Sequence, residues 1–286
     1  MDDQKSEPLD WAAPGFLPPP LHGTMRDRIE AGTHFRVDGD GPAVVLVHGV
    51  GLDLDMWSAQ AEALAQRYTV IRYDMLGHGG SAKPPGLLRL ASYIDQLEMV
   101  HRYFRLGRSV VVGFSMGALV GRAFALAHPE RLAGLALLNG VYDRTPAQLD
   151  AIRARLYQAE TEGPEALIEA ALARWLSPEF RAAAPDAVEA IENRLRANDR
   201  NGFLAAYRVF IEADEAAAGP LADMSCPALV VTGENDLGST PAMAAAMADA
   251  IPDAELHVLP GLAHLAPIEG AEAMNALLLG FLDRLG

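Results

Sequence analysis

Residues 109–120 read SVVVGFSMGALV, in which a β-branched run, the pattern Gly-x-Ser-x-Gly and a helical sequence follow one another. This order predicts a strand, a sharp turn that projects the hydroxyl of Ser115, and a helix. The strained turn needs small neighbours, which Gly113 and Gly117 supply. The first turn of the helix directs free N–H groups toward the hydroxyl, so the amide of Met116 is a predicted oxyanion donor. A glycine-rich turn that merely contains a serine is the alternative, and the flanking strand and helix favour a nucleophile.

The composition indicates one large domain and disfavours two classes of partner. The chain has 286 residues, 50% of them hydrophobic, which suffices for one large domain or a domain with an insertion. Its net charge of −15 disfavours nucleic acid and anionic membranes as partners. With no apolar run of about 18 residues and no basic-then-apolar start, we expect neither a membrane span nor a signal peptide, and a cytoplasmic protein. The single cysteine, Cys226, is expected to be a buried thiol.

Apolar runs alternate with helical periods along most of the chain. Strands are predicted at residues 33–37, 43–47, 69–73, 109–112, 133–138, 228–232 and 255–259. Helices are predicted at residues 56–67 and 92–106, from Met116 to His128, and near 240–250 and 271–284. This alternation predicts an α/β fold with a doubly wound, mostly parallel sheet. Residues 33–37 are expected at an edge of that sheet.

The sequence texture divides the chain into three parts. Residues 1–25 carry five prolines and are expected to form an extended N-terminal arm. Residues 142–219 are rich in Ala, Arg and Glu, show helical periods and contain no strand-like run. We therefore expect a helical lid at 142–219, inserted into a core formed by residues 26–141 and 220–286.

A serine nucleophile predicts two partners elsewhere in the chain. Its hydroxyl reacts weakly at neutral pH and needs a base, which an acid in turn orients. In an open parallel sheet such groups are expected just past the carboxyl ends of strands. Asp236 follows the strand at 228–232 and His264 follows the strand at 255–259, so they are the candidate acid and base. The order Ser115, Asp236, His264 is the nucleophile–acid–base order typical of one hydrolase type.

Other residues compete for these roles. Asp143 also follows a strand and is the alternative acid, whereas a role as a helix cap is the alternative for Asp236. Asp236 is favoured because only a short loop separates it from the next helix. His48 and His78 flank the site, and His48 is expected to brace its loop. His128 is expected to mark the end of a helix.

The second oxyanion donor is expected in the loop that reads HGVG, residues 48–51. The amide of Val50 follows a residue without a side chain and can turn inward, so Val50 is predicted to act beside Met116. No Cys/His cluster has metal-ligand spacing, and Asp53 and Asp55 alone would make a poor site. The sequence therefore predicts neither a metal nor a cofactor.

Five segments together resemble the α/β-hydrolase superfamily. They read HGVG at 48–51, YDMLGHG at 73–79, GFSMG at 113–117, GEND at 233–236 and GLAH at 261–264. The resemblance covers roughly residues 30–140 and 220–286 and implies the α/β-hydrolase fold with a helical lid. Because the nucleophile is Ser115, the chain differs from the haloalkane dehalogenases and epoxide hydrolases of this superfamily, which use an aspartate.

Two segments of the expected lid resemble one subgroup of this superfamily more closely. RWLSPEF at 174–180 and GFLAAY at 202–207 are similar to the lids of 3-oxoadipate enol-lactonases and related hydrolases of aromatic and N-heterocycle breakdown. This implies a cofactor-free carboxylic ester or lactone hydrolase, class EC 3.1.1, that forms an acyl-enzyme. The alternative is hydrolysis of a ring-cleavage product, at a C–C bond or at the enamide or amide bond of a dicarboxylate. A perhydrolase and a non-catalytic ligand receptor rank below these.

A negatively charged protein that processes an acidic substrate needs local positive charge at its site. Arginine can grip a carboxylate with two parallel hydrogen bonds, and residues 142–219 contain no lysine. The candidate substrate contacts are Arg144, Arg174 with its neighbour Trp175, and Arg208, with Arg144 first because it follows a core strand. The alternatives are pairing of these arginines with lid glutamates and a core position for Trp175.

Overall fold

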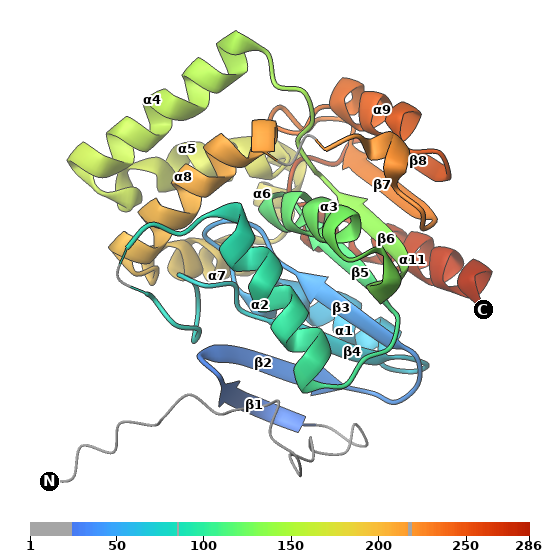
Figure 1. Ribbon diagram of the computed structural model, residues 1–286. Helices are drawn as coiled ribbons and strands as arrows, with labels where there is room; N and C mark the ends of the chain where they lie inside the picture. The colour runs from blue at the N-terminus through green and yellow to red at the C-terminus, as the bar shows by residue number, and fades with distance from the viewer. Residues whose placement is uncertain (1–24, 85, 217–218) are drawn as a thin grey trace, which may run out of the picture.

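The computed structural model describes residues 25–84, 86–216 and 219–286, which are built around one eight-stranded sheet (Figure 1). The strands lie in the order β1-β2-β4-β3-β5-β6-β7-β8. Their bounds are β1 Met25–Glu30, β2 Thr33–Asp38, β3 Ala43–Val47, β4 Thr69–Tyr73, β5 Ser109–Phe114, β6 Leu132–Leu138, β7 Ala228–Gly233 and β8 Ala254–Leu259. The predicted arm at residues 1–25 lies outside the described residues, except for Met25.

The pairing confirms the predicted mostly parallel sheet and corrects one strand position. Strands from β4 to β8 in the sheet order pair in parallel, whereas β2 pairs antiparallel with both β1 and β4. The prediction that residues 33–37 form an edge strand was wrong, because β1 covers that side after a turn through Ala31 and Gly32. Residues 25–30 read MRDRIE, and their charges gave no strand pattern.

Helices cover both faces of the sheet, and a second group of helices lies between β6 and β7 in the sequence. The helices that cover the sheet are α1 Ser58–Leu64, α2 Leu90–Tyr103, α3 Met116–Ala127, α9 Pro241–Ala250, α10 Ala266–Glu269 and α11 Ala271–Leu285. Between β6 and β7 lie α4 Pro146–Glu162, α5 Ile168–Trp175, α6 Pro178–Ala183, α7 Pro185–Arg196 and α8 Arg200–Ala216. Short 3-10 helices are η1 Leu54–Trp57, η2 Pro129–Arg131, η3 Pro164–Leu167 and η4 Leu221–Asp223. Among these described helices, none combines the length and apolar character that crossing a membrane requires.

The unbroken apolar strands supply two cores, one on each face of the sheet. Since successive side chains of a strand point to opposite faces, Val45 and Val47 of β3 pack with α2, α3 and α9. Val44 and Leu46 of the same strand pack with α1 and α11 on the other face. This double layer is the predicted doubly wound architecture.

Two smaller expectations about buried and terminal residues are also confirmed. Cys226 is buried just before β7, and burial raises the pKa of its thiol, which suits a structural role rather than a nucleophilic one. His128 is the residue at which α3 ends.

Residues 146–216, here called the α4–α8 segment, occupy the stretch that was expected to be a lid. In Figure 1, α4, α5 and α8 lie together beyond the carboxyl ends of the central strands. Local sequence explains two of its helix starts, because Thr145 and Ser177 each precede a proline and accept a bond from an amide in the first turn. Gly163, with a φ of 102°, ends α4.

The junction between α7 and α8 is fixed to the core by an ion pair and by a close backbone contact. Arg194 of α7 donates to Asp53 at 3.1 Å, and both side chains are largely buried. Gly202, in the first turn of α8, lies against the backbone of Gly77, which follows β4. A Cβ at position 202 would lie 2.3 Å from the carbonyl oxygen of Gly77. Only glycine therefore allows α8 to approach this closely.

We expect Gly202→Ala to destabilise the protein by about 1–3 kcal/mol, although alanine normally stabilises a helix by about 0.5–1 kcal/mol relative to glycine. The matched control is Gly280→Ala in α11, where an added Cβ would meet nothing within 4 Å. That variant should gain stability. The free energy of unfolding in urea measures both effects, and a gain in both variants would contradict the close contact between Gly77 and Gly202.

Candidate active site

Ser115 stands at the predicted turn between β5 and α3 in a strained conformation. Its φ is 53° and its ψ is −111°, a region that costs a non-glycine residue about 1–3 kcal/mol. Its amide donates to the carbonyl of Leu138 in β6 at 2.9 Å, which fixes the turn to the neighbouring strand. At Gly117 a Cβ would lie 2.1 Å from the carbonyl oxygen of Val47, so the turn requires glycine there. The result is a hydroxyl that projects beyond the end of the sheet.

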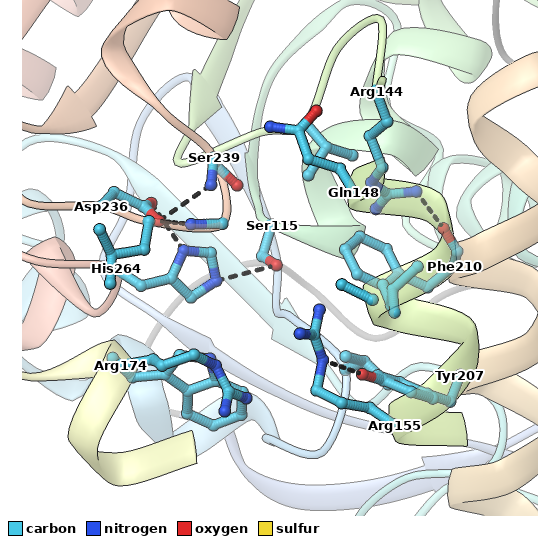
Figure 2. A pocket seen from close by; sticks show the side chains of 17 residues that line it. Ser115, Arg144, Gln148, Arg155, Arg174, Tyr207, Phe210, Asp236, Ser239 and His264 are labelled. Atoms are coloured by element: carbon cyan, nitrogen blue, oxygen red, sulfur yellow. Dashed lines mark hydrogen bonds and ion pairs between the residues drawn. The ribbon is translucent and has the colours of Figure 1, made fainter. Parts of the chain in front are cut away.

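The sheet brings the three residues that the sequence singled out into one hydrogen-bonded chain (Figure 2). His264, in the loop after β8, places Nε2 3.1 Å from Oγ of Ser115. Its Nδ1 lies 2.7 Å from Oδ2 of Asp236, in the loop after β7. All three residues are buried. The arrangement can move a proton from the hydroxyl to the imidazole while a carboxylate holds the ring.

Asp236 is held as a carboxylate by a set of N–H donors. Its Oδ1 accepts bonds from the amides of Gly238 and Ser239 at 2.8 and 2.9 Å, and its Oδ2 accepts from Nδ2 of Asn139 at 2.9 Å. Burial alone would raise the pKa of this carboxyl, but His264 and these donors outweigh burial and lower it. Asn139, directly after β6, is a site residue that sequence reasoning missed. Its position past a strand end was the available signal.

The structure separates the two candidate acids. Asp143 lies past β6 with a left-handed φ of 49° and is not among the described residues that line the pocket around Ser115. Asp236 lines that pocket and bonds to His264. The geometry therefore favours Asp236, as the sequence did.

Both predicted oxyanion donors lie next to Ser115. Met116 is the first residue of α3, so its amide has no acceptor within the helix. Val50 lines the pocket together with Ser115. The loop that carries Val50 is held on its far side by Asn198, whose Nδ2 donates to the carbonyl of Gly51 at 2.7 Å. Asn198 lies just after α7 and was not singled out from the sequence.

Two buried histidines brace the Val50 loop. Nε2 of His48 accepts the amide of Met75 at 2.9 Å, and Nε2 of His78 accepts the amide of Gly51 at 3.0 Å. Both rings are fully buried. Burial lowers the pKa of His48, and burial together with the neighbouring His48 lowers that of His78 to about 3. Each ring is therefore neutral and able to accept an amide, which agrees with the bracing role expected for His48.

The loop of the candidate base is tied to the α4–α8 segment by one carboxylate and one backbone bond. Glu269 of α10 accepts the amide of Ala263 at 3.1 Å and the amide of Ser177 at 3.2 Å. The amide of Leu265 donates to the carbonyl of Trp175 at 2.8 Å. These bonds hold the end of α5 directly against the loop that carries His264.

A pocket of about 160 Å³ opens beside Ser115 and His264 (Figure 2). Core residues form one side of it, and residues of α4, α5 and α8 form the other. Asp236 is the one acidic side chain among the described residues that line it. Within residues 25–84, 86–216 and 219–286, no group of three or more His, Cys, Asp or Glu side chains is arranged to hold a metal ion. The pocket can thus admit a small molecule to the Ser115 hydroxyl.

Three of the four predicted substrate contacts line this pocket. Arg144, Arg174 and Trp175 all face it, and the Trp175 ring centroid lies 6.0 Å from that of His264. Arg208 does not line the pocket, so the geometry disfavours the predicted role of Arg208 as a substrate contact and favours the alternative of pairing with a glutamate. Its guanidinium binds Glu160 of α4 through Nε and Nη2, with the shorter bond at 2.6 Å.

The pocket also contains an arginine that sequence reasoning missed. Arg155 of α4 lines it, and its Nε donates to the hydroxyl of Tyr207 of α8 at 3.3 Å. Arg153, on the same helix, is exposed and pairs with Asp150 instead. The helical pattern alone did not distinguish the inward arginine from the outward one.

Comparisons with known proteins agree on one fold. Residues 42–271 match the family described as alpha/beta hydrolase fold. A curated relative, the (E)-2-((N-methylformamido)methylene)succinate hydrolase of Acinetobacter baylyi, is 32% identical over 87% of this chain and 94% of its own length. The solved enol-lactonase of Burkholderia xenovorans LB400 has a TM-score of 0.82 and 31% identity, and the match covers 88% of this chain and 96% of that one. An esterase of Thermogutta terrifontis, solved with malate bound, has a TM-score of 0.81 and 32% identity over 88% and 93% of the two chains.

Because His48 and His78 are buried as neutral rings, we expect the free energy of unfolding to depend on pH. Because the pKa of His78 falls from 6.5 in the unfolded chain to about 3 in the folded protein, only the unfolded chain gains this proton as the pH falls below 6.5. The free energy of unfolding should therefore decrease from pH 6.5 toward lower pH. His78→Gln keeps an acceptor for the Gly51 amide and should flatten this decrease. Urea unfolding at a series of pH values measures it, and an unchanged slope in the variant would count against a neutral His78.

Proposed function

The chain belongs to the α/β-hydrolase fold family, and on this premise we propose that it is a serine hydrolase that cleaves a carboxylic ester or lactone through an acyl-enzyme. The observation that carries the proposal is the hydrogen-bonded chain from Ser115 through His264 to Asp236. The similarity to an enol-lactonase and to an esterase, each above 30% identity over most of both chains, supports the choice of bond.

In the first half-reaction Ser115 is the nucleophile. As its Oγ attacks the carbonyl carbon, Nε2 of His264 accepts the hydroxyl proton, and the Asp236 carboxylate stabilises the imidazolium that results. The amides of Val50 and Met116 donate to the oxyanion of the tetrahedral intermediate. When the intermediate collapses, His264 returns the proton to the leaving oxygen. The acyl group then remains as an ester on Ser115.

In the second half-reaction water takes the place of the leaving group. His264 accepts a proton from the water as its oxygen attacks the acyl carbon, and the same two amides receive the oxyanion again. The bond to Oγ then breaks, and His264 protonates Ser115. The product is a carboxylic acid, and the enzyme is restored. The two proton transfers between Ser115 and His264 use a contact that already exists in the structure, and the transfers to the leaving oxygen and from water use the same Nε2 atom.

The α4–α8 segment is part of this proposal. We assign residues 142–219 as a lid on a core formed by residues 26–141 and 220–286, because the pocket beside Ser115 is lined from both parts. The bonds from Glu269 and Asp53 to this segment keep it close to the site. A lid of this kind limits the access of bulk solvent to the bond that is cleaved, while the pocket still admits the water that hydrolyses the acyl-enzyme. The cytoplasmic location expected from the sequence stays a prediction.

A second candidate function is hydrolysis of a ring-cleavage product at the amide bond of a dicarboxylate. The relative named a formamidomethylene succinate hydrolase favours it. The same Ser115, His264 and Asp236 would serve this reaction, since amides and esters both react through an acyl-enzyme. A panel of lactones, esters and acylaminomethylene dicarboxylates distinguishes the two by the relative kcat/KM. A ligand receptor would hydrolyse none of them.

We expect Ser115→Ala to fold normally and to lose roughly a millionfold in turnover of an ester substrate. A fluorophosphonate should add covalently to the wild-type protein at Ser115 and not to the variant, as intact mass and peptide mapping would show. The control is a substitution that should leave turnover and labelling unchanged. His48→Gln cannot serve as this control because His48 braces the Val50 loop. His257→Gln is suited instead, because His257 is half-buried on β8 and does not line the pocket. Near-wild-type activity in Ser115→Ala would end the proposal.

The acid is tested by one substitution at each candidate position. Asp236→Asn should lower kcat on the order of 10⁴-fold, because an asparagine cannot hold the imidazole in the productive tautomer. Asp143→Asn should leave kcat within about threefold of wild type. Steady-state kinetics on one ester compares the two variants. The reverse ranking would transfer the role of the acid to Asp143.

A further inference from the structure

We propose that Arg155 and Arg174 form a clamp for a carboxylate, so that the substrate carries a free carboxylate in addition to the bond that is cleaved. The inference rests on the proposed function and specifies its substrate class. Arg155 comes from α4 and Arg174 from α5, and both line the pocket that contains Ser115 and His264. In Figure 2 the terminal nitrogens of Arg155 point toward Ser115, and the Arg174 side chain runs beneath His264 in the direction of Arg155.

Neither arginine forms an ion pair with a carboxylate in the part of the chain that the structure describes. Many other arginines of this acidic chain are paired with a carboxylate, as in Arg36–Asp55, Arg72–Asp38, Arg131–Glu98, Arg194–Asp53 and Arg208–Glu160. Among the described residues, Arg155 and Arg174 form no such ion pair. The one acidic side chain described in the pocket lining, Asp236, is already engaged by His264 and Asn139. The described acidic side chains of this negatively charged protein thus provide no counterion to these two arginines at the pocket.

The positive charges of Arg155 and Arg174 also disfavour each other. Burial and then the like charge of Arg155 lower the pKa of Arg174, and both side chains are half-buried. Two like charges at low solvent exposure are costly unless an anion joins them. A bound carboxylate would offset this cost and would accept charge-assisted hydrogen bonds from both planar groups.

The geometry fixes one arm of the clamp in advance. Nε of Arg155 donates to the Tyr207 hydroxyl, so the ring positions the guanidinium while its two terminal nitrogens point toward the space beside Ser115 (Figure 2). Arg144 behaves differently, because its Nη1 donates to the carbonyl of Phe210 at 3.0 Å and its guanidinium stacks on that ring at 4.3 Å. We therefore assign the clamp to Arg155 and Arg174 rather than to Arg144.

Arg174 stands at the border between the pocket and a smaller apolar recess of about 40 Å³. The recess shares Val50, Arg174, Trp175 and Tyr207 with the pocket. Its remaining walls are apolar, formed by Pro164, Leu167, Ile168, Ala171, Leu195 and Phe203. A substrate whose carboxylate binds Arg174 would place a neighbouring methyl-sized group in this recess. The site thus fits a short acid ester or lactone better than a long-chain one.

The test compares an acidic ester with its neutral counterpart. The probes are 4-nitrophenyl hydrogen glutarate and its methyl ester, and the measurement is the ratio of their kcat/KM values. Wild type should prefer the acidic ester, whereas Arg155→Gln and Arg174→Gln should each lower its kcat/KM by about 10- to 100-fold. The neutral ester should change by less than about threefold. Arg153→Gln removes the same charge from the outer face of α4 and should leave the ratio unchanged.

A binding measurement separates this proposal from the proposed function. Glutarate is titrated calorimetrically into three proteins that all carry Ser115→Ala, so no turnover is needed. One has no further change, one also carries Arg155→Gln and one also carries Arg174→Gln. If wild type hydrolyses neither ester but glutarate binding requires both arginines, the proposed function fails and the clamp stands. If both glutamine variants lose activity on the two esters equally and bind glutarate as tightly as their parent, the clamp is wrong.

Discussion

The strained backbone of Ser115 is the constraint on which the rest of the site depends. A residue stays in such a conformation only where the surrounding packing determines it completely. Here the Ser115 amide is fixed to β6 and α3 lies so close to β3 that Gly117 has no room for a side chain. The β-branched strands that bury the core therefore also hold the hydroxyl in one position. Stability of the sheet and placement of the Ser115 hydroxyl therefore depend on the same contacts.

The central strands and the chain from Ser115 to His264 and Asp236 could be predicted because each part is encoded locally, as an apolar run that ends in a distinctive loop. The missed features depend on contacts between distant segments. Asn198 donates to Gly51, which lies 147 positions earlier in the sequence, and no pattern in either segment predicts this contact. Arg155 and Arg208 look alike in a helical pattern until Glu160 neutralises one of them. The strand β1 was missed because its charged sequence becomes a strand only by pairing with β2.

Charge is distributed unevenly over the molecule. The chain carries a net charge of −15, yet three arginines and one aspartate are the charged side chains among the described residues that line the pocket. Attraction inside the pocket acts at short range, whereas repulsion by the surface extends over a Debye length of about 8 Å at physiological salt. Under the proposed reaction, hydrolysis creates one further carboxylate. The product therefore carries one more negative charge than the substrate, and once it has left the pocket the protein surface repels it more strongly.

Glu269 joins the helical segment to the core through backbone amides, those of Ser177 and Ala263, rather than through side chains. A bond to a backbone amide does not depend on which residue supplies it, unless that residue is proline. Mutations can therefore accumulate in this segment without loosening this attachment. The walls of the pocket can therefore change in sequence while Glu269 keeps the segment attached, so this one carboxylate is compatible with many different pocket linings.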